Sequence, residues 1–257
     1  MNKENELTYK IPQVDEDCVK AIEVACNLRP LTARILVSRG VDTPAKAQRF
    51  LTPSLERDWL DPNLIPGLSD VADKVEAAIR AGKRILVFGD FDVDGITATT
   101  VSVRGLRALG ADVCGLIPHR YNEGYALSQA AVERGMQMSP DLIMTVDCGI
   151  SCADEVSWML EQGIDVCITD HHEPGEKVPS GVPVADPKLD HDCPSCDLAG
   201  VGVALKLLTI LGERFGKPDA WRELTDFAAL GTIADLMTLS PENRALVADG
   251  IHRINTA

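Results

Sequence analysis

The chain has 257 residues, of which 45% are hydrophobic and 25% charged, a composition typical of a globular protein with a buried apolar core. Its net charge of −14 argues against a protein that coats nucleic acid through bulk electrostatic attraction, although an enzyme that binds a few phosphates locally is compatible with it. No apolar run approaches the roughly 20 residues of a membrane span, and the N-terminal stretch MNKENELTYK lacks the apolar core of a signal peptide. We therefore expect a cytoplasmic protein without membrane contact.

Residues 1–65 are expected to form a small, mostly helical segment. The apolar residues of VDEDCVKAIEVACN recur at helical spacing, and TPAKAQRFL begins with Thr43, a good helix cap, followed by Pro44. The stretch TPSLERDWLDPNLIPG is rich in proline and closes with a glycine, which is typical of a connecting segment. The second domain is therefore predicted over residues 66–257.

Short apolar runs recur in this second part and predict strands at Ile85–Phe88, Val113–Ile117, Leu142–Val146, Val166–Thr169 and Val182–Ala185. Segments that can form helices separate the first four runs: Thr97–Leu109, Ser128–Arg134 and Ala153–Glu161. Strands that are apolar throughout and alternate with helices indicate an α/β fold, a parallel, doubly wound sheet of about five strands with helices on both faces. A helical C-terminal part is expected at Gly202–Leu211, Trp221–Met237 and Asn243–Asn255.

The eight cysteines are expected to be reduced, because several lie in predicted strands, where a buried thiol packs as a small hydrophobic group. Only the stretch HDCPSC, residues 191–196, has the spacing of metal ligands. A structural zinc site needs four ligands, and no second CxxC or HxxxH pair is present to complete it. We predict an ordinary loop at this stretch.

Polar side chains follow three of the predicted strands: Asp90, Asp92, Asp94, Asp147, Asp170, His171 and His172. In an open parallel sheet, ligands bind outside the carboxyl ends of the strands, so these groups are expected to converge on one edge. Carboxylates so close to one another repel, and a bound cation would relieve that repulsion.

Parts of this pattern are compatible with simpler or different roles. Asp-Gly is common turn chemistry, and a lone Asp147 or Asp170 can cap a helix. The string DFDVDG matches the start of an EF-hand loop, but position 12 of that loop would be Val101 rather than Glu, and a strand precedes it. A phosphatase with Asp90 as nucleophile and Asp92 two residues on would need a lysine and an acidic pair where this chain has TDHH. Neither a GxSxG elbow nor a GxGxxG turn after the first strand is present.

Carboxylate oxygens together with imidazole nitrogens suit Mn²⁺ or Mg²⁺ better than a metal that prefers thiolates. If the first strand stays extended, its two-residue period places Asp90, Asp92 and Asp94 on one side. The number of acidic groups exceeds what a single ion requires. Two ions about 4 Å apart that share a carboxylate would neutralise them and bind a phosphate.

At these residues the chain resembles the DHH phosphoesterase family, named for a triplet that stands here at Asp170-His171-His172. The motifs GDFDVDGITAT, VDCGIS, DHH and GTIADL appear in the family's order, and within the family the chain resembles the single-strand-specific DNA exonucleases. HRYNEGYALS, LAGVGVALKL, ENRALVADG and LVSRGVDTPAKAQRFLTPSL are also similar to segments of those enzymes, so the resemblance covers about residue 30 to the end. Such enzymes continue into a DHHA1-type and an OB-like domain, which we expect to be absent here.

The resemblance implies roles for individual side chains. It implies metal ligands at Asp92, Asp94, Asp147, His171 and Asp235, with Asp147 bridging two Mn²⁺ or Mg²⁺ ions. Catalytic roles are implied for His172, which would meet the scissile phosphate, and for Asp90 and Asp170 as supports of the ligands. Arg120 would contact a neighbouring phosphate. His119 and Ala126 depart from the residues usual in the family's loop, which we expect to affect substrate contacts at most.

The function implied is a metal-dependent phosphodiesterase that degrades single-stranded DNA from its 5′ end in DNA repair and recombination, with single-strand-binding protein as a further partner. A related enzyme acting on short oligonucleotides, nucleotide phosphates or pyrophosphate is the alternative within the family. The contrasting alternative is a non-catalytic scaffold on the same fold, which should have lost ligands, whereas every matched position is filled here.

Overall fold

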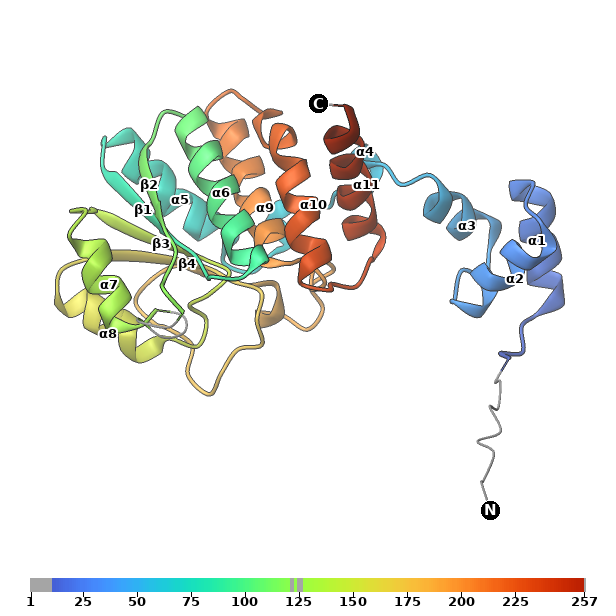
Figure 1. The fold of residues 1–257 in the computed structure, drawn as a ribbon, viewed down its shortest axis with the longest axis horizontal. Coiled ribbons are helices and arrows are strands. Elements are labelled where there is room, and N and C mark those ends of the chain that lie inside the picture. Colours follow the sequence, from blue (N-terminus) through green and yellow to red (C-terminus); the bar gives the residue numbers. More distant parts are fainter. Residues whose placement is uncertain (1–10, 121–122, 124–126, 257) are drawn as a thin grey trace, which may run out of the picture. The chain divides into compact units, whose positions relative to one another are not determined.

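The computed structural model describes residues 11–120, 123 and 127–256 (Figure 1). The chain divides into two compact units, Met1–Pro53 and Ser54–Ala257, each of which is described by itself. None of the helices in the described ranges is long and apolar enough to cross a membrane.

The smaller unit consists of helices α1 (Glu16–Cys26), α2 (Pro30–Ser38) and α3 (Pro44–Leu51). Asp15 caps α1 by accepting hydrogen bonds from the amides of Asp17 and Cys18, and Thr43 caps α3 by accepting one from Lys46. The helices enclose a small core of Val19, Ile22, Ala33, Leu36 and Ala47. Helices α1 and α3 lie where the sequence predicts them, whereas α2 was not predicted.

The larger unit is built on a parallel sheet of β1 (Arg84–Phe88), β2 (Asp112–Leu116), β3 (Leu142–Val146), β4 (Asp165–Thr169) and β5 (Val184–Ala185). The strand order is β2-β1-β3-β4-β5. The five-stranded parallel sheet is therefore confirmed. Strand β5 begins at Val184 rather than at Val182, because Pro183 has no N–H to donate and only its carbonyl accepts a hydrogen bond, from Ile168.

Helices cover both faces of the sheet (Figure 1). On one side lie α5 (Leu68–Arg80), α6 (Val93–Ala108), α9 (Gly200–Arg214), α10 (Thr225–Ala234) and α11 (Pro241–Thr256), and on the other α7 (Gln129–Met136) and α8 (Ala153–Glu161). The side chains of β1 alternate between the two cores: Ile85 and Val87 join the larger core, and Leu86 and Phe88 the smaller one. This alternation confirms the doubly wound arrangement.

The segment that includes α4 (Leu55–Asp58) and the 3₁₀ turn η1 (Pro62–Leu64) belongs to the larger unit, so the division falls before residue 65. Trp59 stacks on Trp221, with 5.4 Å between ring centroids. The Nζ atom of the fully buried Lys206 on α9 lies 3.7 Å from the Trp59 ring centroid and 2.5 Å from Glu242 Oε1 on α11. These contacts fix residues 54–65 to the body of the larger unit.

The HDCPSC stretch forms an irregular loop after the 3₁₀ turn η2 (Pro187–Leu189). Cys193 is buried, with Sγ 3.5 Å from the carbonyl oxygen of Leu64, whereas Cys196 is exposed. Ser195 between them donates a hydrogen bond of 2.8 Å to Glu242. The loop thereby packs against η1 and α11.

Candidate metal centre

The acidic motif after β1 folds as a turn and a helix start. Strand β1 ends at Phe88, and Asp92 is the N-cap of α6, where its Oδ1 accepts a hydrogen bond of 2.9 Å from the amide of Gly95. Gly95 is required because a Cβ there would lie 2.5 Å from the carbonyl oxygen of Asp90. The expectation of an extended strand through Asp90, Asp92 and Asp94 is wrong, because the strand ends at Phe88 and Asp92 caps a helix that contains Asp94.

Asp94 lies in the first turn of α6 and is held by the N-terminus of α9. The amide of Gly200 donates to Asp94 Oδ2 at 2.7 Å, and the amide of Val201 donates to Oδ1 at 3.0 Å. A Cβ at Gly200 would lie 2.5 Å from Asp147 Oδ1, so glycine allows the helix to approach both carboxylates. Burial, followed by repulsion from Asp147, raises the pKa of Asp94 to about 8.

Asp147 follows β3 and is buried. Its backbone adopts the left-handed conformation, with a φ of 60°. Its amide donates to the carbonyl oxygen of Thr169, which continues the ladder with β4. Burial and then the charge of Asp92 raise the pKa of Asp147 to about 8. An acidic side chain in a strained backbone conformation at this edge is typical of a functional position.

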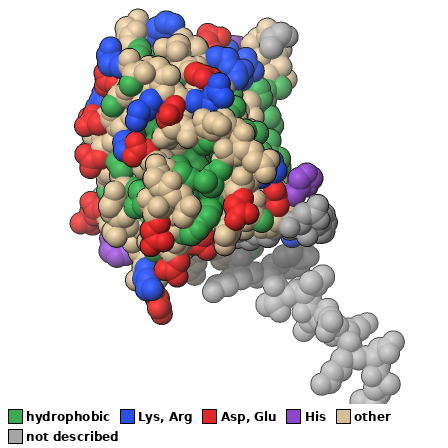
Figure 2. Space-filling view, turned by 90° about the vertical axis from the view of Figure 1, so that its left-hand side faces the viewer, with side chains coloured by type: hydrophobic (Ala, Val, Ile, Leu, Met, Phe, Trp, Pro, Cys, Tyr) green, Lys and Arg blue, Asp and Glu red, His purple; other side chains and the backbone are tan. Residues whose placement is uncertain are grey.

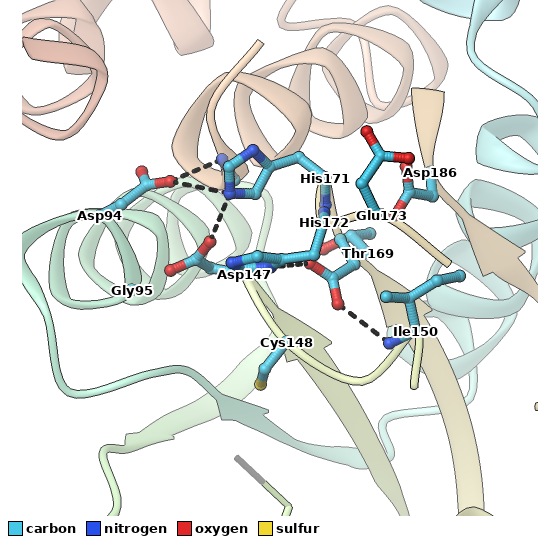
Figure 3. A network of polar contacts seen from close by, with 12 residues as sticks. Asp94, Gly95, Asp147, Cys148, Ile150, Thr169, His171, His172, Glu173 and Asp186 are labelled. Atoms are coloured by element: carbon cyan, nitrogen blue, oxygen red, sulfur yellow. Dashed lines mark hydrogen bonds and ion pairs between the residues drawn. The ribbon is translucent and has the colours of Figure 1, made fainter. Parts of the chain in front are cut away.

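Asp170 organises the triplet that follows β4, and Figure 3 labels the two histidines of this triplet. It accepts hydrogen bonds from the amides of Ile150 (2.9 Å), His171 (2.7 Å) and His172 (3.3 Å), and its Oδ1 lies 2.8 Å from His172 Nδ1. Burial opposes ionisation of Asp170, but the hydrogen bond with His172 and these amides lower its pKa below the usual value. The same hydrogen bond raises the pKa of His172 to about 9, against the opposing effect of burial.

His171 points towards the carboxylates of Asp94 and Asp147, which come from different elements (Figure 3). Its Nε2 lies 3.0 Å from Asp147 Oδ1 and 3.7 Å from both Asp94 Oδ2 and Asp235 Oδ2, where Asp235 ends α10. Neither ring nitrogen of His171 has a hydrogen-bond partner within the described residues, and nor does Asp147 Oδ1. Buried polar atoms without partners in a ring of carboxylates indicate a site for a cation.

Potential ligand atoms within 4.8 Å of one another form adjoining groups in the described part of the chain. One group contains Asp94, His171 and Asp235, another Asp90, Asp92 and Asp147, and a third Asp147, His171 and His172. The close approach of Asp147 to His171 joins them into one site at the carboxyl edge of the sheet.

The sequence model described as the DHH family, N-terminal domain, matches residues 84–232. The chain belongs to the DHH family. It is 40% identical over 256 residues to the single-stranded-DNA-specific exonuclease RecJ of Bacillus subtilis, covering 97% of this chain and 31% of that protein. Identity to the RecJ of Thermus thermophilus is 48% over 202 residues, covering 77% of this chain and 30% of that protein. The chain thus spans about a third of the length of these curated relatives, and the predicted family membership is confirmed.

Solved structures with the same fold include RecJ enzymes crystallised with metal ions. An exonuclease RecJ bound to manganese matches with a TM-score of 0.69 at 46% identity, covering 75% of this chain and 49% of that one. RecJ from Thermus thermophilus in complex with Mn²⁺ matches with a TM-score of 0.77 at 37% identity, covering 95% of this chain and 34% of that one. The complex of RecJ from the same organism with Mg²⁺ gives a TM-score of 0.68 at 34% identity, covering 95% and 30% of the two chains.

The aspartates and histidines that the sequence predicts as site residues lie together at the carboxyl edge of the sheet in this DHH domain. Arg120 is the exception. Arg120 follows β2, and its guanidinium lies 4.9 Å from the ring centroid of Phe91. Both side chains line a cavity of about 440 Å³ together with Ile117, Pro118 and His119. Ala126 of the same loop lies outside the described residues.

One further acidic residue at this edge of the DHH domain was missed. Asp186 follows β5, is fully buried, and is one of the residues of the polar network drawn in Figure 3. Its Oδ1 accepts the amide of Lys188 at 2.8 Å, and burial, aided by the charge of Asp170, raises its pKa to about 7. The signal was available, because an aspartate also follows the fifth predicted strand.

Proposed function

We propose that this DHH domain hydrolyses phosphodiester bonds of single-stranded DNA with the aid of two divalent metal ions. The observation that carries the proposal is the pair of ligand groups that adjoin at Asp147, one of them around the imidazole of His171, to which the described residues offer no hydrogen-bond partner. The RecJ relatives are named as single-stranded-DNA-specific exonucleases, and RecJ structures contain Mn²⁺ or Mg²⁺.

The residues present fit such ions. The donor set consists of carboxylate oxygens and imidazole nitrogen, which suits Mn²⁺ or Mg²⁺. One ion would be held by Asp94, Asp147, His171 and Asp235, and the other by Asp90, Asp92 and Asp147. We assign Asp90 as a ligand rather than as a support, because its carboxylate groups with those of Asp92 and Asp147. Asp147 would bridge the two ions.

When bound, the ions would lower the pKa of a water molecule and stabilise negative charge that develops on the phosphate. The side chains of the triplet have separate tasks. The hydrogen bond with Asp170 orients the His172 ring and raises its pKa to about 9, and nearly half of the His172 side-chain surface is exposed, at 46%. The His172 imidazolium would therefore hold an oxygen of the scissile phosphate. Arg120 would contact a neighbouring phosphate from the cavity beside Phe91.

Degradation from the 5′ end, a role in DNA repair and recombination, and contact with single-strand-binding protein are parts of the same proposal. The role in DNA repair is supported by the names of the relatives, of which this chain spans about a third, whereas the 5′ polarity and the contact with single-strand-binding protein rest on the resemblance of the sequence motifs alone. A scaffold without activity is disfavoured, because unneutralised buried carboxylates at Asp94 and Asp147 would carry a cost without a benefit.

The test is hydrolysis by the purified chain with Mn²⁺, offered a 5′-labelled single strand, the matching duplex, a dinucleotide and pyrophosphate in parallel. We expect the single strand to be degraded from its labelled end and the duplex to resist. Preferred cleavage of the dinucleotide or pyrophosphate would instead favour the small-substrate enzyme, and no cleavage of any substrate would favour the scaffold. Asp147→Asn serves as the inactive control.

A further inference from the structure

We propose that an exposed apolar ridge beside the candidate metal centre holds the unpaired bases of the substrate strand and thereby selects single strands. The ridge consists of Val93 and Ile96 on α6, Leu230 and Ile233 on α10, and Leu236 just after α10. This inference rests on the proposed function, because it names the substrate contact of the same site. Leu236 is its most exposed residue.

Leu236 combines two unfavourable features. Its backbone has a φ of 56°, a left-handed conformation that leucine rarely adopts, and its side chain is 90% exposed. Its amide donates to the carbonyl oxygen of Ile233 at 3.2 Å, which closes the end of α10 directly after Asp235. Both the strained backbone and the exposed leucine are energetically unfavourable. Such features persist mainly at functional sites, and Leu236 directly follows a candidate ligand.

The other members of the ridge lie next to the same ligands. Val93 stands between Asp92 and Asp94 in the first turn of α6, and Ile96 follows within the next turn. Exposure of these four side chains is similar, at 48% for Val93, 46% for Ile96, 47% for Leu230 and 46% for Ile233. The ridge therefore begins between the residues that would hold the ions.

The two helices of the ridge cross at a close contact. A Cβ at Gly231 would lie 2.3 Å from Thr97 Oγ1 and 2.7 Å from Asp94 Oδ1, so only glycine allows this approach. Leu230 and Ile96 are the chain neighbours of Gly231 and Thr97, and they flank the crossing. The exposed apolar side chains of α6 and α10 therefore belong to two helices that meet at this crossing, next to the candidate ligand Asp94.

The charge of the protein favours bases as the occupants. A net charge of −14 opposes binding of a polyanion through its phosphates, and on the face in Figure 2 the basic side chains are interspersed with acidic ones. An unpaired base offers a flat apolar face that can pack on exposed hydrophobic side chains, whatever its sequence. In a duplex these faces are stacked and paired, so the ridge would discriminate against double strands.

The test compares a labelled single strand with the same strand carrying abasic nucleotides at its 5′ end. Affinity is measured by fluorescence anisotropy and hydrolysis by steady-state kinetics, both with Mn²⁺. We expect Leu236→Ser to raise KM for the normal strand about five- to tenfold with little change in kcat, as the loss of one apolar contact predicts. The variant should leave KM for the abasic strand unchanged, and Leu236→Met should restore the wild-type value.

Leu160→Ser is the control, because Leu160 is an exposed leucine outside the ridge, near the C-terminal end of α8, although it is less exposed than Leu236 (37% against 90%). Equal effects of Leu236→Ser on normal and abasic strands would overturn the proposal, as would a change of oligomeric state in that variant, which would indicate a protein partner for the ridge. If the wild type hydrolysed the normal and the abasic strand equally well, the base-binding role of the ridge would be refuted and the proposed function would stand. Base-dependent binding without hydrolysis would refute the proposed function and leave the ridge in place.

Discussion

Asp147 and Leu236 share a backbone conformation that is rare for residues other than glycine, and both flank the cluster around His171. For Asp147 the left-handed turn aims the carboxylate back towards β4, and for Leu236 it places an apolar side chain in solvent. The sequence could identify both positions as interesting, since one follows a strand and the other a motif aspartate. It could not reveal their φ angles, because these depend on how the surrounding elements are packed.

At Asp147 we predict that replacement by Asn abolishes hydrolysis without unfolding the protein. Asn has nearly the same shape and tolerates positive φ, but it cannot supply the charged oxygens that two ions would share. Activity should fall more than about 100-fold, measured as single-turnover cleavage of a labelled strand. Thermal unfolding in the absence of metal should occur at an equal or higher temperature, because a buried carboxylate with a raised pKa is removed. Retention of full activity would rule out the bridging role.

At Leu236 we predict that a substitution which stabilises the protein weakens its binding of single-stranded DNA. Leu236→Gly relieves the left-handed strain and loses almost no buried surface, so the free energy of unfolding should rise by about 1 kcal/mol in chemical denaturation. Weaker binding of a single strand should accompany the gain. A variant that is less stable than the wild type would show that the Leu236 side chain packs on the fold.

At the scale of elements, the alternation of apolar strands and helices was sufficient to predict the parallel sheet and the edge at which the site lies. Helix α5 was missed, although Leu68, Val71, Ala72 and Val75 have helical spacing. The course of the chain through Asp90, Asp92 and Asp94 was predicted wrongly, because strand periodicity was extended beyond the helix cap. The contact between the α9 amides and Asp94 joins residues distant in sequence, so local patterns carry no signal for it.

The start of α9 can be tested with two glycines of one helix. Gly200→Ala should keep the fold but displace Asp147, because the new methyl group would lie 2.5 Å from its Oδ1. We expect Mn²⁺ affinity to fall at least about tenfold, measured by isothermal titration calorimetry. Gly202→Ala is the control, since its Cβ would meet only the Leu198 side chain at 3.0 Å. Similar metal affinities in the two variants would contradict the proposed placement of the ions.

At the scale of the whole molecule, repulsion among buried carboxylates couples metal binding to stability. Asp94 and Asp147 both have pKa values raised to about 8, so the metal-free protein bears a desolvation cost that bound cations would relieve.

We therefore predict that each bound Mn²⁺ ion, at about 100 times its Kd, stabilises the larger unit by about 2.7 kcal/mol, which corresponds to a rise in Tm of about 5–10 °C per ion. Differential scanning fluorimetry with and without a chelator measures the shift. The chelator should also abolish hydrolysis. In Asp147→Asn the shift should be strongly reduced, and an undiminished shift would place the stabilising ions elsewhere.

The indole pair Trp59 and Trp221 joins two segments far apart in the chain, and the chain contains only one other tryptophan, Trp158. Stacked indoles couple their electronic transitions, and the resulting signal depends on how Trp59 lies against Trp221. The signal therefore reports whether residues 54–65 are attached to the core. Loosening of that attachment, for example in Lys206→Met, would be visible in near-ultraviolet circular dichroism before any global melting, without a dye or a tag.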